Sequence, residues 1–61
     1  MDKQYITKQA KIAQKTDNEL VKKDCYWRIL SNSDCPDLSE DGSLTTSQYQ
    51  QAEQICKESN N

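Results

Sequence analysis

The segment Cys25–Leu30 is the one place in the sequence where large apolar side chains crowd together. It contains the only Trp and one of the three Tyr residues, whereas Lys, Gln, Asp, Ser and Asn dominate both flanks. Ordering a residue during folding costs about 1.5 kcal/mol, which the burial of apolar surface has to offset. The core of this chain must therefore be built around this segment.

The length of 61 residues predicts one small domain over 1–61. A chain of this size leaves much of its surface exposed, so we expect no deep substrate cavity. Only nine residues are Ile, Leu or Val, and there is no Phe. We therefore expect a marginal fold that a partner, self-association or a crosslink completes.

Apolar residues at helical spacing predict an all-α fold. The first helix is expected at 3–15, with an apolar face and exposed lysines on the other side. The sequence Thr16–Glu19 has the capping-box pattern, in which the Thr hydroxyl accepts from the third amide of a helix and Glu reaches back to the cap. It predicts a second helix at 17–31.

The same capping-box pattern recurs at Thr45–Gln48, with Gln in the third place, and predicts a third helix at 45–58. An acidic loop at about 32–44 precedes it. We expect a three-helix domain in which the first two helices form a hairpin and the third packs across it.

On a helix, the side chains of Cys25–Leu30 point in nearly every direction, which is more than two short amphipathic helices can cover. We therefore divide them between a core and a contact surface. The predicted core side is Val21, Cys25 and Ile29. The predicted partner-binding residues, of types that dominate interface energies, are Tyr26, Trp27, Arg28 and Tyr49.

The segment from Asp37 to Gln48 has oxygen-bearing side chains at loop positions 1, 3, 5 and 9, Gly at 6 and an aliphatic residue at 8. It resembles the twelve-residue calcium loop of the EF-hand family, although Gln48 stands where that family has Glu. The alternative is a turn that ends in a Thr helix cap. The resemblance implies the calcium ligands Asp37, Ser39, Asp41, Ser43, Thr45 and Gln48.

Three cysteines leave several chemistries open. Cys25 and Cys35 are separated by nine residues, which resembles half of the twin-cysteine helical hairpins of the mitochondrial intermembrane space. Cys56 lacks the matching partner, because position 46 is Thr. A disulfide, a zinc site with Asp34 or a partner residue as a further ligand, and reduced thiols in the core are the alternatives. We expect reduced core thiols.

The charge is divided between the two halves of the chain. Residues 1–30 carry seven Lys or Arg and four acids, whereas residues 31–61 carry one Lys and six acids. Such a dipole can steer association with a charged partner, unless the halves lie together and neutralise each other. The basic half also permits a DNA-binding alternative, a helix-turn-helix unit around Lys15 and Thr16. The net charge of −2 argues against nucleic acid.

Catalytic signatures are missing from the sequence. There is no His, no Gly-rich phosphate loop and no nucleophile elbow, so we expect neither an enzyme nor a cofactor. No apolar run could span a membrane, and we expect a cytoplasmic chain. The predicted function is that of a small protein-binding regulator, inhibitor or accessory subunit, a class that includes phage- and plasmid-encoded antagonists of host proteins.

Overall fold

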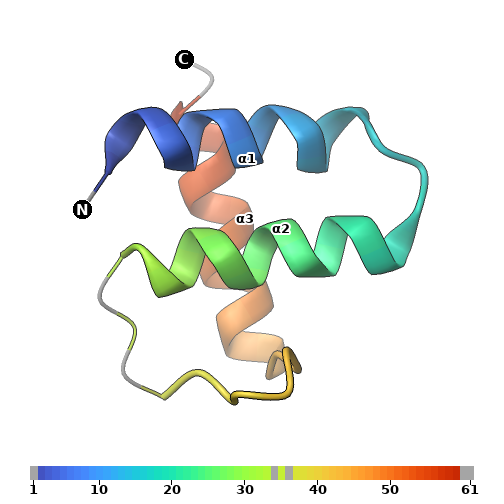
Figure 1. The fold of residues 1–61 in the computed structure, drawn as a ribbon, viewed down its shortest axis with the longest axis vertical. Coiled ribbons are helices and arrows are strands. Elements are labelled where there is room, and N and C mark those ends of the chain that lie inside the picture. Colours follow the sequence, from blue (N-terminus) through green and yellow to red (C-terminus); the bar gives the residue numbers. More distant parts are fainter. Residues whose placement is uncertain (1, 34, 36, 60–61) are drawn as a thin grey trace.

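The computed structural model describes residues 2–33, 35 and 37–59. They form three helices, α1 (Lys3–Lys15), α2 (Glu19–Ser31) and α3 (Thr46–Ser59). Helices α1 and α2 lie side by side and antiparallel, and α3 crosses both of them on one face (Figure 1). The predicted all-α fold, a hairpin with a third helix across it, is confirmed, and α1 has the predicted bounds.

Helix α2 begins two residues later than predicted, because the first capping box does not form. The backbone N–H of Thr16 donates to the carbonyl of Ile12 at 3.0 Å and closes the last turn of α1. The amide that Glu19 would have to reach is therefore already satisfied. Asn18 caps α2 instead, since its side-chain oxygen accepts from the N–H of Leu20 at 2.9 Å.

The second capping box does form, at the start of α3. The N–H of Thr45 donates to Oε1 of Gln48 at 3.0 Å, and the N–H of Gln48 donates to Oγ1 of Thr45 at 3.1 Å. Gln48 is only 7% exposed, and its Nε2 also donates to the carbonyl of Asp37 at 3.1 Å. One buried amide thus starts α3 and ties the preceding loop to it. The helix itself is shifted by one residue from the predicted 45–58.

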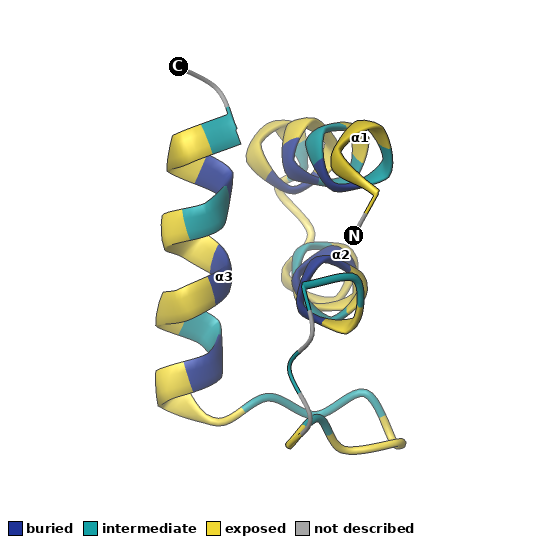
Figure 2. Cartoon of the chain, turned by 90° about the vertical axis from the view of Figure 1, so that its left-hand side faces the viewer, coloured by how far each residue is buried: buried dark blue, intermediate teal, exposed yellow. Residues whose placement is uncertain are grey.

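The core combines three long aliphatic side chains and one aromatic ring with several short side chains. Ile29 and Leu30 of α2 are fully buried, and Ala10 of α1 and Ala52 of α3 are buried with them. Figure 2 shows that the buried parts of the three helices face the space between them. The complete buried cluster is Ile6, Ala10, Ala13, Cys25, Tyr26, Ile29, Leu30, Ala52 and Cys56.

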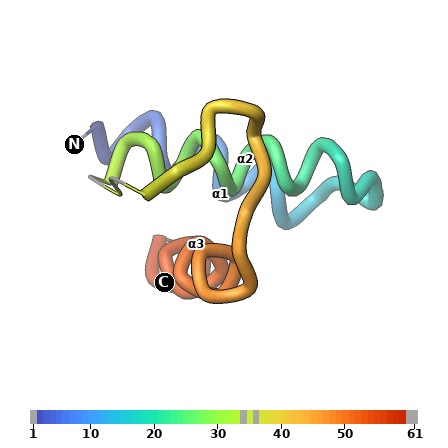
Figure 3. Tube along the Cα trace, turned by 90° about the horizontal axis from the view of Figure 1, so that it is seen from below, coloured from blue at the N-terminus to red at the C-terminus, as the bar shows by residue number. Residues whose placement is uncertain are grey.

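The connection between α2 and α3 follows the edge of α2 that lies away from α1 (Figure 1). Leu38 and Leu44 are half-buried and pack against the core, so they anchor it at two points. Gly42 has a φ of 85°, which glycine adopts without strain, and its N–H donates to the carbonyl of Ser39 at 3.3 Å. The segment 39–42 rises on the side of α2 opposite α3 (Figure 3).

We predict that Gln48→Ala lowers the free energy of unfolding by about 1–3 kcal/mol, because the Thr45 amide and the Asp37 carbonyl lose their partly buried hydrogen-bond partner. The measurement is urea unfolding followed by circular dichroism. Gln50→Ala, an exposed change in the same helix, is the matched control and should be nearly neutral. Equal stability of the two variants would contradict this role of Gln48.

Candidate functional site: the open face of the helical hairpin

Tyr26, which we predicted at a contact surface, lies in the core. It is 3% exposed, and its ring meets that of Tyr49 edge to face, with centroids 4.8 Å apart and planes at 75°. Burial raises the pKa of Tyr26 to about 12. Helix α3 covers this side of α2, so the assignment of Tyr26 to a contact surface is wrong. Tyr49, its half-buried partner, packs against the core from α3, and its role in partner binding stays a prediction.

Trp27 and Arg28 lie nearer the surface. Trp27 is half-buried, and its Nε1 donates to the carbonyl of Ser39 at 2.8 Å, which holds the loop against α2. Arg28 is exposed and pairs with Asp24 at 2.9 Å, and its Nη1 donates to the hydroxyl of Tyr5 on α1 at 3.4 Å. The hydrogen bonds to Tyr5 and Asp24 raise the pKa of Arg28, so the side chain stays cationic.

The contact between Arg28 and Tyr5 fixes the register of α1 against α2. Ile12 is seven residues after Tyr5, and Val21 is seven residues before Arg28, so each pair lies on one side of its helix, two turns apart. Because the helices are antiparallel (Figure 1), both steps lead toward the turn of the hairpin. Ile12 and Val21 therefore lie across from each other near that turn.

This side of the hairpin is turned away from α3. Nε2 of Gln14 donates to the carbonyl of Cys56 on α3 at 3.4 Å, which shows the side of α1 that α3 covers. Tyr5 is nine residues from Gln14, or about half a turn around the helix axis. The uncovered side is the candidate site. We call it the open hairpin face and define it as Tyr5, Ile12, Leu20, Val21 and Arg28.

Three large aliphatic side chains are exposed within the described residues, and all three belong to the open hairpin face. Leu20 is 77% exposed, Ile12 40% and Val21 39%. Leu20 lies beside Asp24 and the loop segment 41–43, around a shallow hollow of about 290 Å³. The prediction that Val21 belongs to the core is wrong, because α3 covers the other side of α2. The face thus has an apolar end near the turn and a Tyr–Arg pair near the other end.

Sequence reasoning missed Tyr5, Ile12 and Leu20 as site residues. A signal was present, because the seven-residue spacing of Tyr5 and Ile12 matches that of Val21 and Arg28. This spacing identifies a shared surface only when the register of α1 against α2 and the face covered by α3 are both known.

The charge division of the sequence persists in the fold. Helix α1 contains four lysines and no acid, while the loop at the opposite edge of the hairpin contains Asp37, Glu40 and Asp41 (Figure 1). The part of the chain that the structure describes has two ion pairs, Arg28–Asp24 within α2 and Lys57–Glu53 within α3. The basic and acidic edges therefore do not neutralise each other by direct pairing.

Lys22 is half-buried, and its Nζ lies 5.9 Å from the centre of the Tyr26 ring. Lys23 remains exposed, as do the lysines of α1. Helices α1 and α2 lie side by side, whereas the two helices of a helix-turn-helix unit cross steeply.

In the loop that resembles a calcium site, several of the proposed ligand oxygens take part in bonds within the chain. Oδ1 of Asp41 accepts from both the N–H and the hydroxyl of Ser43, at 2.9 and 2.7 Å, and these bonds lower the pKa of Asp41. Oε1 of Gln48 accepts from Thr45. The described residues contain no group of three or more His, Cys, Asp or Glu side chains that could hold a metal ion.

Two of the three cysteines belong to the core, as predicted. Cys25 and Cys56 are 3% and 2% exposed, and burial raises the pKa of both thiols, that of Cys56 to about 11. Cys35 is half-buried against the same cluster. Asp34, considered as a zinc ligand, lies outside the described residues.

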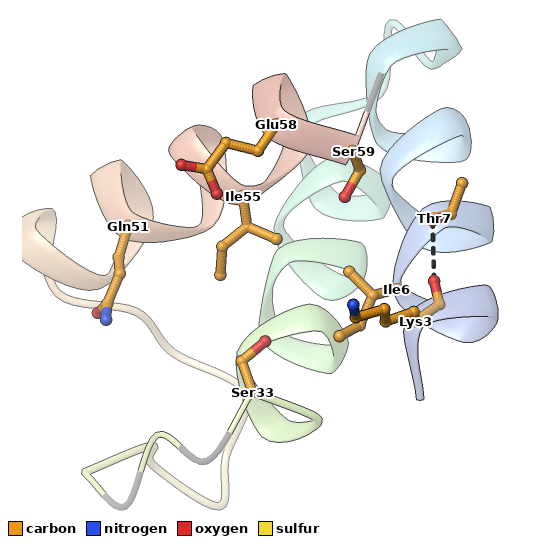
Figure 4. A pocket seen from close by; sticks show the side chains of 8 residues that line it. All are labelled: Lys3, Ile6, Thr7, Ser33, Gln51, Ile55, Glu58 and Ser59. Carbon is orange, nitrogen blue, oxygen red and sulfur yellow. Dashed lines mark hydrogen bonds between the residues drawn. The ribbon is translucent and has the colours of Figure 1, made fainter. Parts of the chain in front are cut away.

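A second hollow, of about 550 Å³, lies between α1 and α3 (Figure 4). Ile6 and Ile55 supply its apolar side chains, and Lys3 and Glu58 stand on opposite helices at its rim. It can accept an apolar group, but the residues that line it form no acid–base pair.

No protein-family model, no curated protein and no solved structure matches this chain. No helix in the described residues combines the length and the apolar character needed to cross a membrane. The candidate site therefore stands on its geometry alone.

We predict that Trp27→Phe loosens the loop. A smaller aromatic ring remains, but the carbonyl of Ser39 loses its 2.8 Å donor, so the free energy of unfolding should fall by about 0.5–1.5 kcal/mol. Amide hydrogen exchange should become faster at Gly42, whose N–H donates to the same carbonyl. Tyr5→Phe, which loses a hydroxyl on the other side of α2, should leave that exchange unchanged. Unaltered exchange in the Trp27 variant would refute the anchoring role.

We predict that stability falls as pH rises from about 8.5, where an unfolded thiol titrates, toward 11, the pKa of folded Cys56. In this window the unfolded chain loses a proton that the folded chain retains, which favours unfolding. Urea unfolding at about pH 8 and about pH 10.5 under reducing conditions measures the slope. Cys56→Ala should flatten it, whereas Cys35→Ala should flatten it less. An equal slope in wild type and Cys56→Ala would rule this cause out.

Proposed function

We propose that this chain acts by binding another protein through the open hairpin face. The observation that carries the proposal is that the exposed large aliphatic side chains of the described residues are Ile12, Leu20 and Val21, all within a few residues of the turn between α1 and α2. Contiguous apolar surface bordered by charged groups is typical of protein interaction sites. In a chain with only nine Ile, Leu and Val residues, the exposure of three is a substantial loss of core material.

The other end of the face supports the same function. Tyr5 and Arg28 are residue types that often dominate interface energies. Arg28 is held between Asp24 and the Tyr5 hydroxyl, so it would lose less side-chain freedom on binding than an unrestrained Arg. Trp27 contributes through its hold on the loop beside the face.

The proposed role is that of a non-enzymatic regulator, inhibitor or accessory subunit that acts by occupying a surface of its partner. A small apolar patch suits a partner with a matching apolar groove or helix face. The separated basic and acidic edges would orient the partner as it approaches.

We predict that Leu20→Asp combined with Val21→Asp weakens partner binding at least about ten-fold, because two carboxylates would be buried against an apolar surface. The wild-type chain is used to capture its partner from native lysate, and the Kd is then measured with the purified partner. Gln50→Asp together with Gln54→Asp on α3 is the matched control and should bind normally. Circular dichroism checks that both variants fold.

Full binding by the Leu20 and Val21 variant would overturn the assignment of the open hairpin face. If that variant does not fold, the conservative pair Leu20→Ser and Val21→Thr tests the same surface, again with an expected loss of affinity.

A further inference from the structure

We propose that the partner of the open hairpin face is a second copy of this chain, with two hairpins packed face to face as a four-helix bundle. This inference rests on the proposed function, because it names the occupant of the same surface. A two-fold symmetric pair uses one surface twice, so that surface must be complementary to itself. The apolar and charged residues of the face are complementary to themselves for one of the two possible orientations of the two-fold axis.

The axis can run along the helices or across them. An axis along the helices lays α1 of one copy over α2 of the other and keeps the two turns of the hairpins at the same end. An axis across the helices lays α1 over α1 and brings the turn of one hairpin to the open end of the other. These alternatives can be judged separately by the apolar patch and by the charges.

The apolar patch favours the axis along the helices. Ile12 is three residues before the end of α1, and Leu20 and Val21 are the second and third residues of α2, so all three lie near the turn that joins these helices. Only when the two turns coincide do the three side chains of one copy meet the three of the other. Their mutual burial then removes apolar surface from water on both copies, which is the main favourable term in association.

The charges favour the same axis. Lys8, Lys11 and Lys15 are exposed and form a ridge on the side of α1 opposite its buried residues. Glu40 and Asp41 lie on the loop at the other edge of the hairpin. An axis along the helices sets the lysine ridge of each copy beside the acidic loop of the other, at two equivalent places. An axis across them would oppose like charges.

The shape of the face also fits this arrangement. Because the segment 39–42 rises on the side of α2 opposite α3, the loop borders one edge of the open hairpin face (Figure 3). The α1 helix of a second copy would lie inside this wall, with Lys8 and Lys11 turned toward Glu40 and Asp41. Neither ion pair among the described residues uses these four side chains. Lys8, Lys11 and Glu40 are therefore available for contacts between copies, whereas Oδ1 of Asp41 already accepts two hydrogen bonds from Ser43.

The experiment is sedimentation equilibrium of the purified chain from micromolar to millimolar concentration. The wild type should change with concentration from the 7.0 kDa chain to twice that mass. Lys11→Glu alone and Glu40→Lys alone should each weaken self-association about ten-fold, since each creates two contacts between like charges. Lys57→Glu, the same change of charge on α3, should have little effect.

Mixing the two variants gives the sharpest result. A pair of one Lys11→Glu chain with one Glu40→Lys chain has opposite charges at both equivalent places, so association should recover. Recovery when Lys11→Glu is mixed with wild type instead would show the axis across the helices and overturn the arrangement.

A wild-type chain that stays at 7.0 kDa at millimolar concentration would overturn self-association. That result leaves the proposed function standing, because capture of a different protein through Leu20 and Val21 is measured separately. A dimer that neither Leu20→Asp with Val21→Asp nor the charge variants weaken would show that another surface associates.

Discussion

The burial of Ile29 and Leu30 depends on how closely the other two helices approach α2. Both side chains are fully buried, although α1 and α3 contribute mostly short residues to the cluster, among them the fully buried Ala10 and Ala52. The distance between packed helices follows the size of the side chains at their contact, so alanines let short helices close around one pair of large residues. A larger side chain at Ala52 would hold α3 away from α2 and open the core.

The small number of large apolar residues also accounts for the open hairpin face. Helix α3 covers one face of the hairpin and the α2–α3 loop covers one edge, and no described element covers the other face. Leu20 and Val21 therefore stay exposed beside Ile12, although they are as apolar as the core residues. The proposed association, with a partner protein or a second copy, would supply the missing layer. The fold and the proposed function thus both follow from the small number of large apolar residues in the chain.

Much of the fold and little of the site could be predicted. Helical periodicity located three helices, and the crowded segment correctly indicated the centre of the core. The side chains around α2 could not be sorted into core and surface, because that depends on where α3 crosses. Tyr26 is buried because Tyr49 packs against it from a helix more than twenty residues away, while Val21 points to the uncovered side. Periodicity describes one helix and contains no information on which of its sides a distant helix will cover.

The two capping-box patterns separate what the sequence determines from what the tertiary structure determines. By itself the sequence determined that Thr16 and Thr45 each stand where a helix can start, because the residue types fit the local hydrogen bonds. The fold decided that only the second pattern closes: the Thr16 amide already serves the end of α1, whereas the Thr45 amide follows a loop and is available to Gln48. The fold likewise gave Gln48 its third bond, to the Asp37 carbonyl. A local motif specifies which bonds are available, and the path of the chain decides which of them form.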